Sequence, residues 1–185
     1  VYRRSEVGRG QSAEFHQAGV EVVGSASPGE DAGTIALLVE ALEAAGLGPG
    51  EDFMVVLGQA AFYRGFLERS CPEVAPALLS ALAGKDLVRV EELSRRLPDA
   101  VAAGARGIPR LVGPASDGAV LEEAERYASG GGGAALENLR AILELLGAHG
   151  RLEAVMLDLG LIGRHDYYTG AVYEVYAAGL GFTVA

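Results

Sequence analysis

The first residues able to do chemistry lie in the stretch EFHQAGVEVVG, which alternates as a β-strand does. On such a strand Gln17, Gly19 and Glu21 share one face. Glycine in a strand often marks close approach by a ligand or another backbone, and the flanking amide and carboxylate would stand roughly 13 Å apart. Two interpretations fit this face equally: a pocket for a small polar molecule, or a solvent-exposed sheet surface.

A second candidate region runs from Asp158 to Tyr176 and carries four of the seven tyrosines of the chain. Strand alternation predicts two faces here, one with Tyr168, Val172, Glu174 and Tyr176 and the other with Tyr167, Ala171, Tyr173 and Val175. Buried tyrosines usually need a partner for the hydroxyl group, so the cluster can form a ligand floor. It also fits an amphipathic strand with half-buried tyrosines.

A third candidate is Arg3. Residues 1–24 follow the pattern of a β-hairpin, and Arg3 lies on the strand that pairs with the strand of Gln17. Its guanidinium can hold a carboxylate or a phosphate through two parallel hydrogen bonds. Cys71 is the single cysteine, which excludes a disulfide and a cysteine metal site within this sequence. Because no nucleophile set and no cluster with metal-ligand spacing stands out, we predict no catalytic residue, no metal and no cofactor.

Composition limits the class of protein further. The chain has 185 residues, half of them hydrophobic, which is enough for one domain with a sizeable core. Its net charge of −10 and its single lysine argue against nucleic acid as a partner, because phosphate backbones are bound through Lys and Arg. No apolar run is long enough to cross a membrane. We expect a cytoplasmic protein, and an interior piece of a longer chain since it starts at Val1.

The candidate residues must be positioned by a mixture of strands and helices. The pattern predicts a hairpin over 1–24, a helix over 31–45 capped by Asp31, strands over 53–58, 154–159, 171–176 and 181–185, helices over 60–69 and 134–148, a helical insert over 71–128 and a four-glycine linker at 130–133. This order is typical of an α+β fold, with an antiparallel sheet and flanking helices, rather than regular βαβ units.

Two segments together resemble the catalytic core of histidyl-tRNA synthetase, a class II aminoacyl-tRNA synthetase. YRRSEVGRGQSAEFHQAGVE resembles the motif 2 hairpin of that family, and IGRHDYYTGAVYE resembles its histidine-recognition motif. The resemblance implies the antiparallel sheet of that catalytic core over residues 1–185, flanked by helices, with residues 71–128 as a small helical insert within it.

The resemblance also implies a histidine-binding site. Arg3 aligns with the arginine that holds the ATP α-phosphate and the amino-acid carboxylate, and Gln17 with the residue that holds the amino-acid backbone. Glu21 and Tyr168 align with the residues that read the imidazole, and Tyr167 lines the same pocket. An imidazole has one N–H donor and one acceptor, which a carboxylate and a phenol on opposite walls can satisfy.

Departures from the family pattern bear on catalysis. The family's recognition motif begins Arg-Gly-Leu-Asp-Tyr-Tyr with a catalytic arginine, but Gly163 stands at that position and Arg164 is shifted by one. The hairpin turn has Ser5, Gln11 and Ala13 where the family has charged residues. Adenylation requires cations directed at the developing phosphate charge, so these changes should disable it and spare a histidine pocket.

The pattern DLG…YYTG and the stretch LLSALAGKD resemble the synthetase-like regulatory subunits of ATP phosphoribosyltransferase, the first enzyme of histidine biosynthesis. This resemblance implies a non-catalytic homodimer that joins and activates the short catalytic subunit and takes part in feedback by histidine, with histidine bound by this chain or by the partner. Two alternatives remain: an active histidyl-tRNA synthetase that uses Arg164, and a stand-alone amino-acid-binding paralogue.

Overall fold

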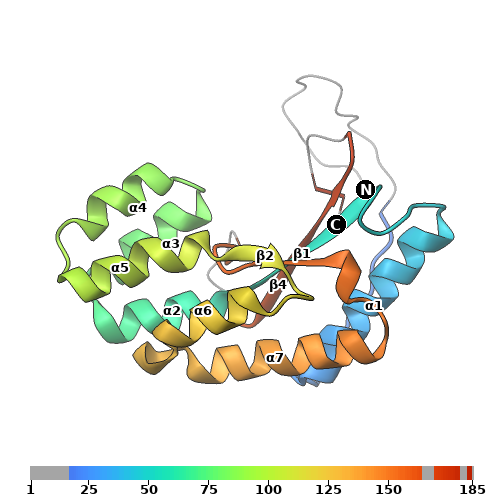
Figure 1. Cartoon of the computed structure of the whole chain (residues 1–185), viewed down its shortest axis with the longest axis horizontal. Coiled ribbons are helices and arrows are strands. Elements are labelled where there is room, and N and C mark those ends of the chain that lie inside the picture. The colour runs from blue at the N-terminus through green and yellow to red at the C-terminus, as the bar shows by residue number, and fades with distance from the viewer. Residues whose placement is uncertain (1–16, 164–168, 180–182, 185) are drawn as a thin grey trace.

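The computed structural model describes residues 17–163, 169–179 and 183–184 (Figure 1). Its elements in chain order are α1 (Pro28–Ala44), β1 (Phe53–Gln59), α2 (Ala60–Ser70), α3 (Ala75–Ala83), α4 (Leu87–Ser94), α5 (Asp99–Gly107), η1 (Ile108–Arg110), β2 (Val112–Pro114), α6 (Ala119–Tyr127), η2 (Ala128–Gly132), α7 (Gly133–Ala148), η3 (Leu152–Ala154), β3 (Val155–Asp158) and β4 (Ala171–Ala177). The helices and the sheet make an α+β fold, as the sequence predicts.

The strands form one mixed sheet in the order β2-β3-β1-β4. β4 runs antiparallel to β1, and β2 runs antiparallel to β3, but the central strands β1 and β3 are parallel. The prediction of an antiparallel sheet is therefore wrong for the central pair. The physical reason is the long helical connection between β1 and β3, which returns the chain to the same end of the sheet, as a parallel pair requires.

One side of this sheet is packed against helices and the other is more open. Along β1, buried Phe53, Val55 and Leu57 alternate with the half-buried Met54 and Val56. Helix α7 contacts both β1 and α1, so α1 and α7 form a layer against the buried side (Figure 1). The helical spacing of four leucines in α7 predicts that they point inward, and all four are buried: Leu136, Leu139, Leu143 and Leu146.

Helix α1 begins three residues earlier than the sequence pattern predicts. Ser27, not Asp31, is its N-cap, and the Ser27 hydroxyl accepts a hydrogen bond from the Glu30 amide at 3.4 Å. Pro28 follows in the first helical turn, where a missing N–H costs nothing. At the far end Gly46 has a φ of 90°, which confirms it as the residue that ends the helix.

The four-glycine segment is a packed joint, so its prediction as a linker is wrong. Residues 128–132 form a kinked turn, with Gly131 at a φ of 109°, that is packed against α2. A Cβ on Gly65 would lie 2.7 Å from the carbonyl oxygen of Gly131, and a Cβ on Gly132 would lie 2.6 Å from the Phe62 ring. The glycines are needed because two backbones meet here with no room for side chains.

Helices α3, α4 and α5 form a cluster at one end of the molecule (Figure 1). The buried Tyr63 hydroxyl of α2 donates a hydrogen bond to the Ala105 carbonyl of α5 at 2.9 Å, and the Phe66 ring lies against Gly104. Strand β2, later in the chain, joins the main sheet beside β3. The division of the chain at residues 71 and 128 stays a prediction.

Candidate functional site

The more open face of the sheet carries a pocket of about 180 Å³ between the strands and the α3–α4 turn. Strand register places its floor: Val56 of β1 stands opposite Glu174 of β4, and Met54 stands opposite Tyr176. The lining residues are Val56, Leu82, Ala83, Lys85, Leu87, Pro109, Asp158, Gly160, Leu161, Ile162, Gly163, Glu174 and Tyr176. Apolar side chains therefore surround four groups that can ionise, an arrangement typical of small-molecule sites.

Strand β4 positions two of those groups as the sequence predicts. Val172, Glu174 and Tyr176 pair in register with Gly58, Val56 and Met54, alternate residues of β1, so they share one face. Glu174 and Tyr176 lie next to each other on this face, and the Tyr176 hydroxyl donates to a Glu174 carboxylate oxygen at 2.7 Å. This hydrogen bond, together with burial, raises the pKa of the Tyr176 phenol.

Lys85 reaches the same pair from the turn between α3 and α4. Its Nζ lies 3.9 Å from a Glu174 carboxylate oxygen and donates to the Tyr176 hydroxyl at 3.4 Å. The backbone of Lys85 has a φ of 57°, a left-handed conformation that is unfavourable for a residue with a side chain. Its amide still bonds to the Leu82 carbonyl, so the helix end fixes this conformation and directs the lysine to the sheet.

Asp158 supplies the fourth ionisable group at the end of β3. Its carboxylate accepts a hydrogen bond from the Gly160 amide at 2.8 Å and starts the turn that follows the strand. Burial raises the pKa of the Asp158 carboxyl, although this hydrogen bond and the charge of Lys85 oppose the shift. The turn crosses β1 so closely that a Cβ on Gly58 would overlap the carbonyl oxygen of Leu161.

The pocket combines two carboxyl groups, one ammonium and one phenol. Such a set can bind a zwitterion, with the ligand's ammonium near the carboxylates and its carboxylate near Lys85. The part of the chain that the structure describes holds no group of three or more His, Cys, Asp or Glu residues placed to bind a metal ion. None of the described helices is both long and apolar enough to cross a bilayer.

The predicted histidine-binding residues are only partly described. Arg3, Tyr167 and Tyr168 lie outside the described residues, as does Arg164. Gln17 and Glu21 are described and exposed, and neither lines the pocket. The assignment of these five residues, Arg3, Gln17, Glu21, Tyr167 and Tyr168, to a histidine site stays a prediction.

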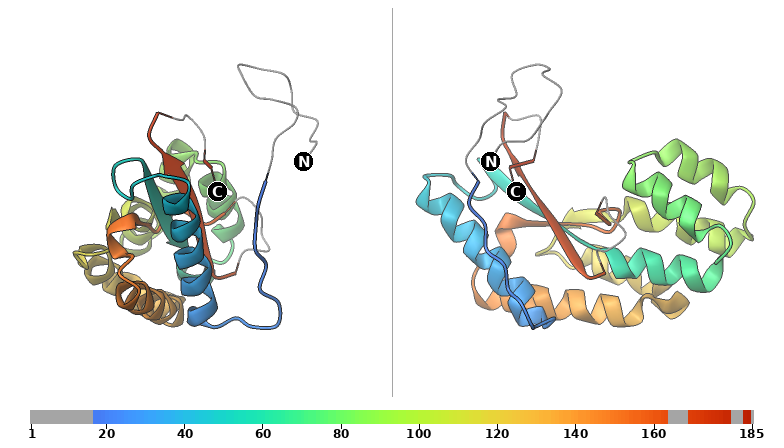
Figure 2. Two further views of the ribbon diagram at one scale, coloured as in Figure 1. Left: turned by 90° about the vertical axis from the view of Figure 1, so that its right-hand side faces the viewer. Right: turned by 180° about the vertical axis from the view of Figure 1, so that it is seen from behind.

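The returning strand of the predicted hairpin is wrong for residues 17–24. Figure 2 shows this segment as an extended trace outside the helix and sheet layers, and it has no strand assignment. Val20 and Val22 lie on the other, mostly apolar face of that predicted strand, which should face the core, but they are 53% and 45% exposed, and nothing lies within 4 Å of a Cβ on Gly19. Among the described residues no strand pairs with this segment, so alternation alone does not bury its apolar side.

All four ionisable groups of the pocket had weak signals in the sequence. Val172, Glu174 and Tyr176 stand at every second position of the predicted strand and so share one face, and Lys85 is the single lysine of the chain. Asp158 follows a strand and precedes Gly160 by two residues, a spacing typical of an Asp-initiated turn. The sequence does not show that Lys85 and Glu174 lie close together in the fold, because the two residues are far apart along the chain.

The chain is similar to known proteins of one family. The model of the family described as histidyl-tRNA synthetase matches residues 1–185. Two curated relatives, from Moorella thermoacetica and Geobacter sulfurreducens, are 38% and 36% identical over 100% of this chain, and both are named ATP phosphoribosyltransferase regulatory subunit. The chain covers 47% and 42% of these two relatives, so it spans less than half of their length.

A solved structure from Bacillus halodurans has a similar fold. It matches with a TM-score of 0.77 and 28% sequence identity over 86% of this chain and 42% of that chain. Its title describes an ATP phosphoribosyltransferase regulatory subunit/histidyl-tRNA synthetase. The mixed sheet and its helical layers are thus shared with a protein that carries both descriptions.

Proposed function

Since this chain belongs to the histidyl-tRNA synthetase family, we propose that it acts as a non-catalytic regulatory subunit of ATP phosphoribosyltransferase in histidine biosynthesis. The observation that carries the proposal is the identity of 38% and 36%, over the whole chain, to relatives with that name. The partner is a short-form catalytic subunit, which this chain activates within a hetero-oligomer that contains a homodimer of the regulatory subunit.

The loss of synthetase activity is supported by the backbone at Gly163. The family's catalytic arginine aligns with this position, and Gly163 has a φ of 76°. An arginine would pay about 1 kcal/mol or more for this left-handed conformation. The backbone of the turn after β3 therefore favours glycine at the position where adenylation requires a positively charged residue.

Histidine is the effector in this proposal. Arg3 and Gln17 hold its carboxylate and backbone, Glu21 and Tyr168 read its imidazole, and Tyr167 lines the pocket. Feedback follows if histidine binds two states of the assembly with different affinity, because a ligand shifts an equilibrium only by its differential affinity. The segment that resembles the histidine-recognition motif begins where the more open face of the sheet ends. This face would therefore form a wall beside the histidine pocket.

The test of the regulatory role is reconstitution with a purified short-form catalytic subunit. We expect phosphoribosyl transfer to rise on mixing, and added histidine to suppress the activated assembly. A mixture no more active than the catalytic subunit alone would refute the proposal.

The histidine pocket is tested separately by calorimetry. Glu21→Ala and Tyr168→Phe should each weaken histidine binding by roughly 1–3 kcal/mol, the usual cost of an unpaired buried polar group. Glu51→Ala is a matched control, because Glu51 is exposed and does not line the pocket. Unchanged affinity in both pocket variants would remove these residues from the site.

An active histidyl-tRNA synthetase is the second candidate, favoured by the double description of the Bacillus halodurans structure. In that case Arg164 would supply the missing cation from the neighbouring position. Histidine-dependent exchange of pyrophosphate into ATP, abolished by Arg164→Ala, would identify this activity.

A further inference from the structure

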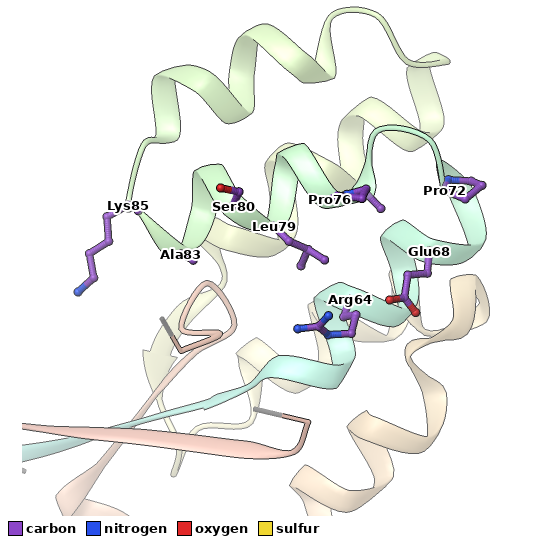
Figure 3. A pocket seen from close by; sticks show the side chains of 10 residues that line it. Arg64, Glu68, Pro72, Pro76, Leu79, Ser80, Ala83 and Lys85 are labelled. Atoms are coloured by element: carbon purple, nitrogen blue, oxygen red, sulfur yellow. The ribbon is translucent and has the colours of Figure 1, made fainter. Parts of the chain in front are cut away.

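A second cavity, larger than the sheet pocket, lies between α2 and α3. It is a groove of about 1030 Å³ lined by Arg64, Glu68, Pro72, Ala75, Pro76, Leu79, Ser80, Ala83, Gly84 and Lys85 (Figure 3). Ala83 and Lys85 also line the sheet pocket, so the two cavities meet at the α3–α4 turn. Neither the sequence pattern nor the regulatory role assigns a ligand to the groove.

Arg64 is the unusual residue of this groove. Its Nε is buried and has no hydrogen-bond partner among the described residues, and its guanidinium is directed into the cavity (Figure 3). Among the ion pairs of the described residues none involves Arg64, although Glu68 follows it by one turn of α2. A buried donor without an acceptor costs about 1–3 kcal/mol. Because this Nε is closed to solvent, an anion in the groove would bind the terminal nitrogens of the same guanidinium.

The opposite wall of the groove is apolar. Pro72 and Pro76 precede and open α3, and Leu79 and Ala83 continue along the same helix. Lys85 lines the end of the groove, although its ammonium is directed to Glu174 and Tyr176 of the sheet pocket. A ligand in the groove would therefore meet a guanidinium and a carboxylate on the α2 side, a mainly aliphatic surface on the α3 side, and Lys85 at the end.

We propose that the groove between α2 and α3 binds a small organic anion. Its phosphate or carboxylate lies against the guanidinium of Arg64, within reach of Lys85, and its apolar body packs on α3. Arginine suits both groups because its planar fork matches their oxygens. The volume is at the upper end of the range for small-molecule sites, so the groove admits a molecule the size of a nucleotide.

Calorimetry at low ionic strength with three probes tests this site. Inorganic phosphate supplies the charge alone, phenyl phosphate adds an apolar ring, and benzoate keeps the ring with a carboxylate. We expect phenyl phosphate to bind several-fold more tightly than inorganic phosphate, because the ring buries surface on α3. Whether phenyl phosphate or benzoate binds better identifies the preferred anion. No saturable binding of any probe would overturn the proposal.

Variants locate the binding. Arg64→Gln should weaken the best probe about tenfold or more, while Arg69→Gln, on an exposed arginine of the same helix outside the groove, should leave affinity within about twofold. Equal losses in both variants would show unspecific attraction and overturn the proposal. If Arg64→Gln does not fold, Arg64→Lys and Lys85→Gln test the same contacts, and full affinity in both would overturn it. Because these measurements use this chain alone, their failure leaves the regulatory role untouched, and failure of reconstitution leaves the groove untouched.

Discussion

The sheet pocket and the α2–α3 groove share Lys85 but differ in how their charged groups are satisfied. In the sheet pocket, Glu174 accepts from Tyr176 and pairs with Lys85, and Asp158 accepts from a backbone amide. In the groove, the Nε of Arg64 has no acceptor in the part of the chain that the structure describes. A charged side chain in a cavity is therefore not by itself evidence for a ligand, because neighbouring protein groups can supply its hydrogen bonds and ion pairs. A buried donor left without an acceptor is stronger evidence.

The largest expected effect comes from the joint that fixes α2, which forms one wall of the groove. Gly65→Ala should lower the free energy of unfolding by about 2–3 kcal/mol, because the added Cβ meets the backbone of Gly131. Gly33→Ala is the control: it lies in α1 with nothing within 4 Å of the new Cβ, and it should stabilise by about 0.5–1 kcal/mol. Urea unfolding measures both. Equal effects at the two glycines would refute the close contact.

A smaller effect is expected where α2 is tied to the helical cluster. Tyr63→Phe leaves the Ala105 carbonyl without its buried donor and should cost about 1–2 kcal/mol. Tyr176→Phe removes an exposed hydroxyl and should change stability by less than about 0.5 kcal/mol. If the two substitutions cost the same in urea unfolding, the distinction between a buried tie and a surface contact fails.

Two substitutions of Lys85, which lies where the two cavities meet, separate the effect of backbone strain on stability from the effect of the charge. Lys85→Gln and Lys85→Gly both remove the ammonium, but glycine also relieves the left-handed backbone. The glycine variant should therefore be more stable than the glutamine variant by about 0.5–1 kcal/mol. A thermal unfolding series measures this difference, and a less stable glycine variant would contradict it.

The smallest effect is a pH dependence in the sheet pocket. Burial raises the pKa of Asp158 in the folded state, so folding favours its protonated form, and this group lowers stability as the pH rises through and above the ordinary pKa of an aspartate, about 3.9. Asp158→Asn keeps an acceptor for Gly160 but does not ionise. Its stability relative to the wild type should therefore improve over that pH range in urea unfolding. Parallel pH profiles would show that Asp158 is not desolvated.

Much of the layout follows from sequence periodicity. The buried leucines of α7 were predictable from their helical spacing. The shared face of Glu174 and Tyr176 on β4 was predictable because side chains of a strand alternate between its two faces. The parallel pairing of β1 with β3 was not, because both strands are short hydrophobic runs that fit either direction.

The residues of the two cavities were harder to predict. Lys85 and Glu174 meet only through the packing of α3 beside the sheet, and no local pattern reports that distance. Arg64 lies on a helix whose sequence shows an ordinary surface arginine, and no local pattern reports that its Nε is buried. The glycines at 130–133 read as a linker because a close backbone contact leaves no trace in the sequence except the glycines themselves.

We propose that this chain, which belongs to the histidyl-tRNA synthetase family, has a regulatory function without adenylation. Its most direct test is histidine-dependent exchange of pyrophosphate into ATP, measured on a preparation that also activates the short-form catalytic subunit. The account predicts activation with exchange at the background level. Exchange above background that disappears in Arg164→Ala would contradict it.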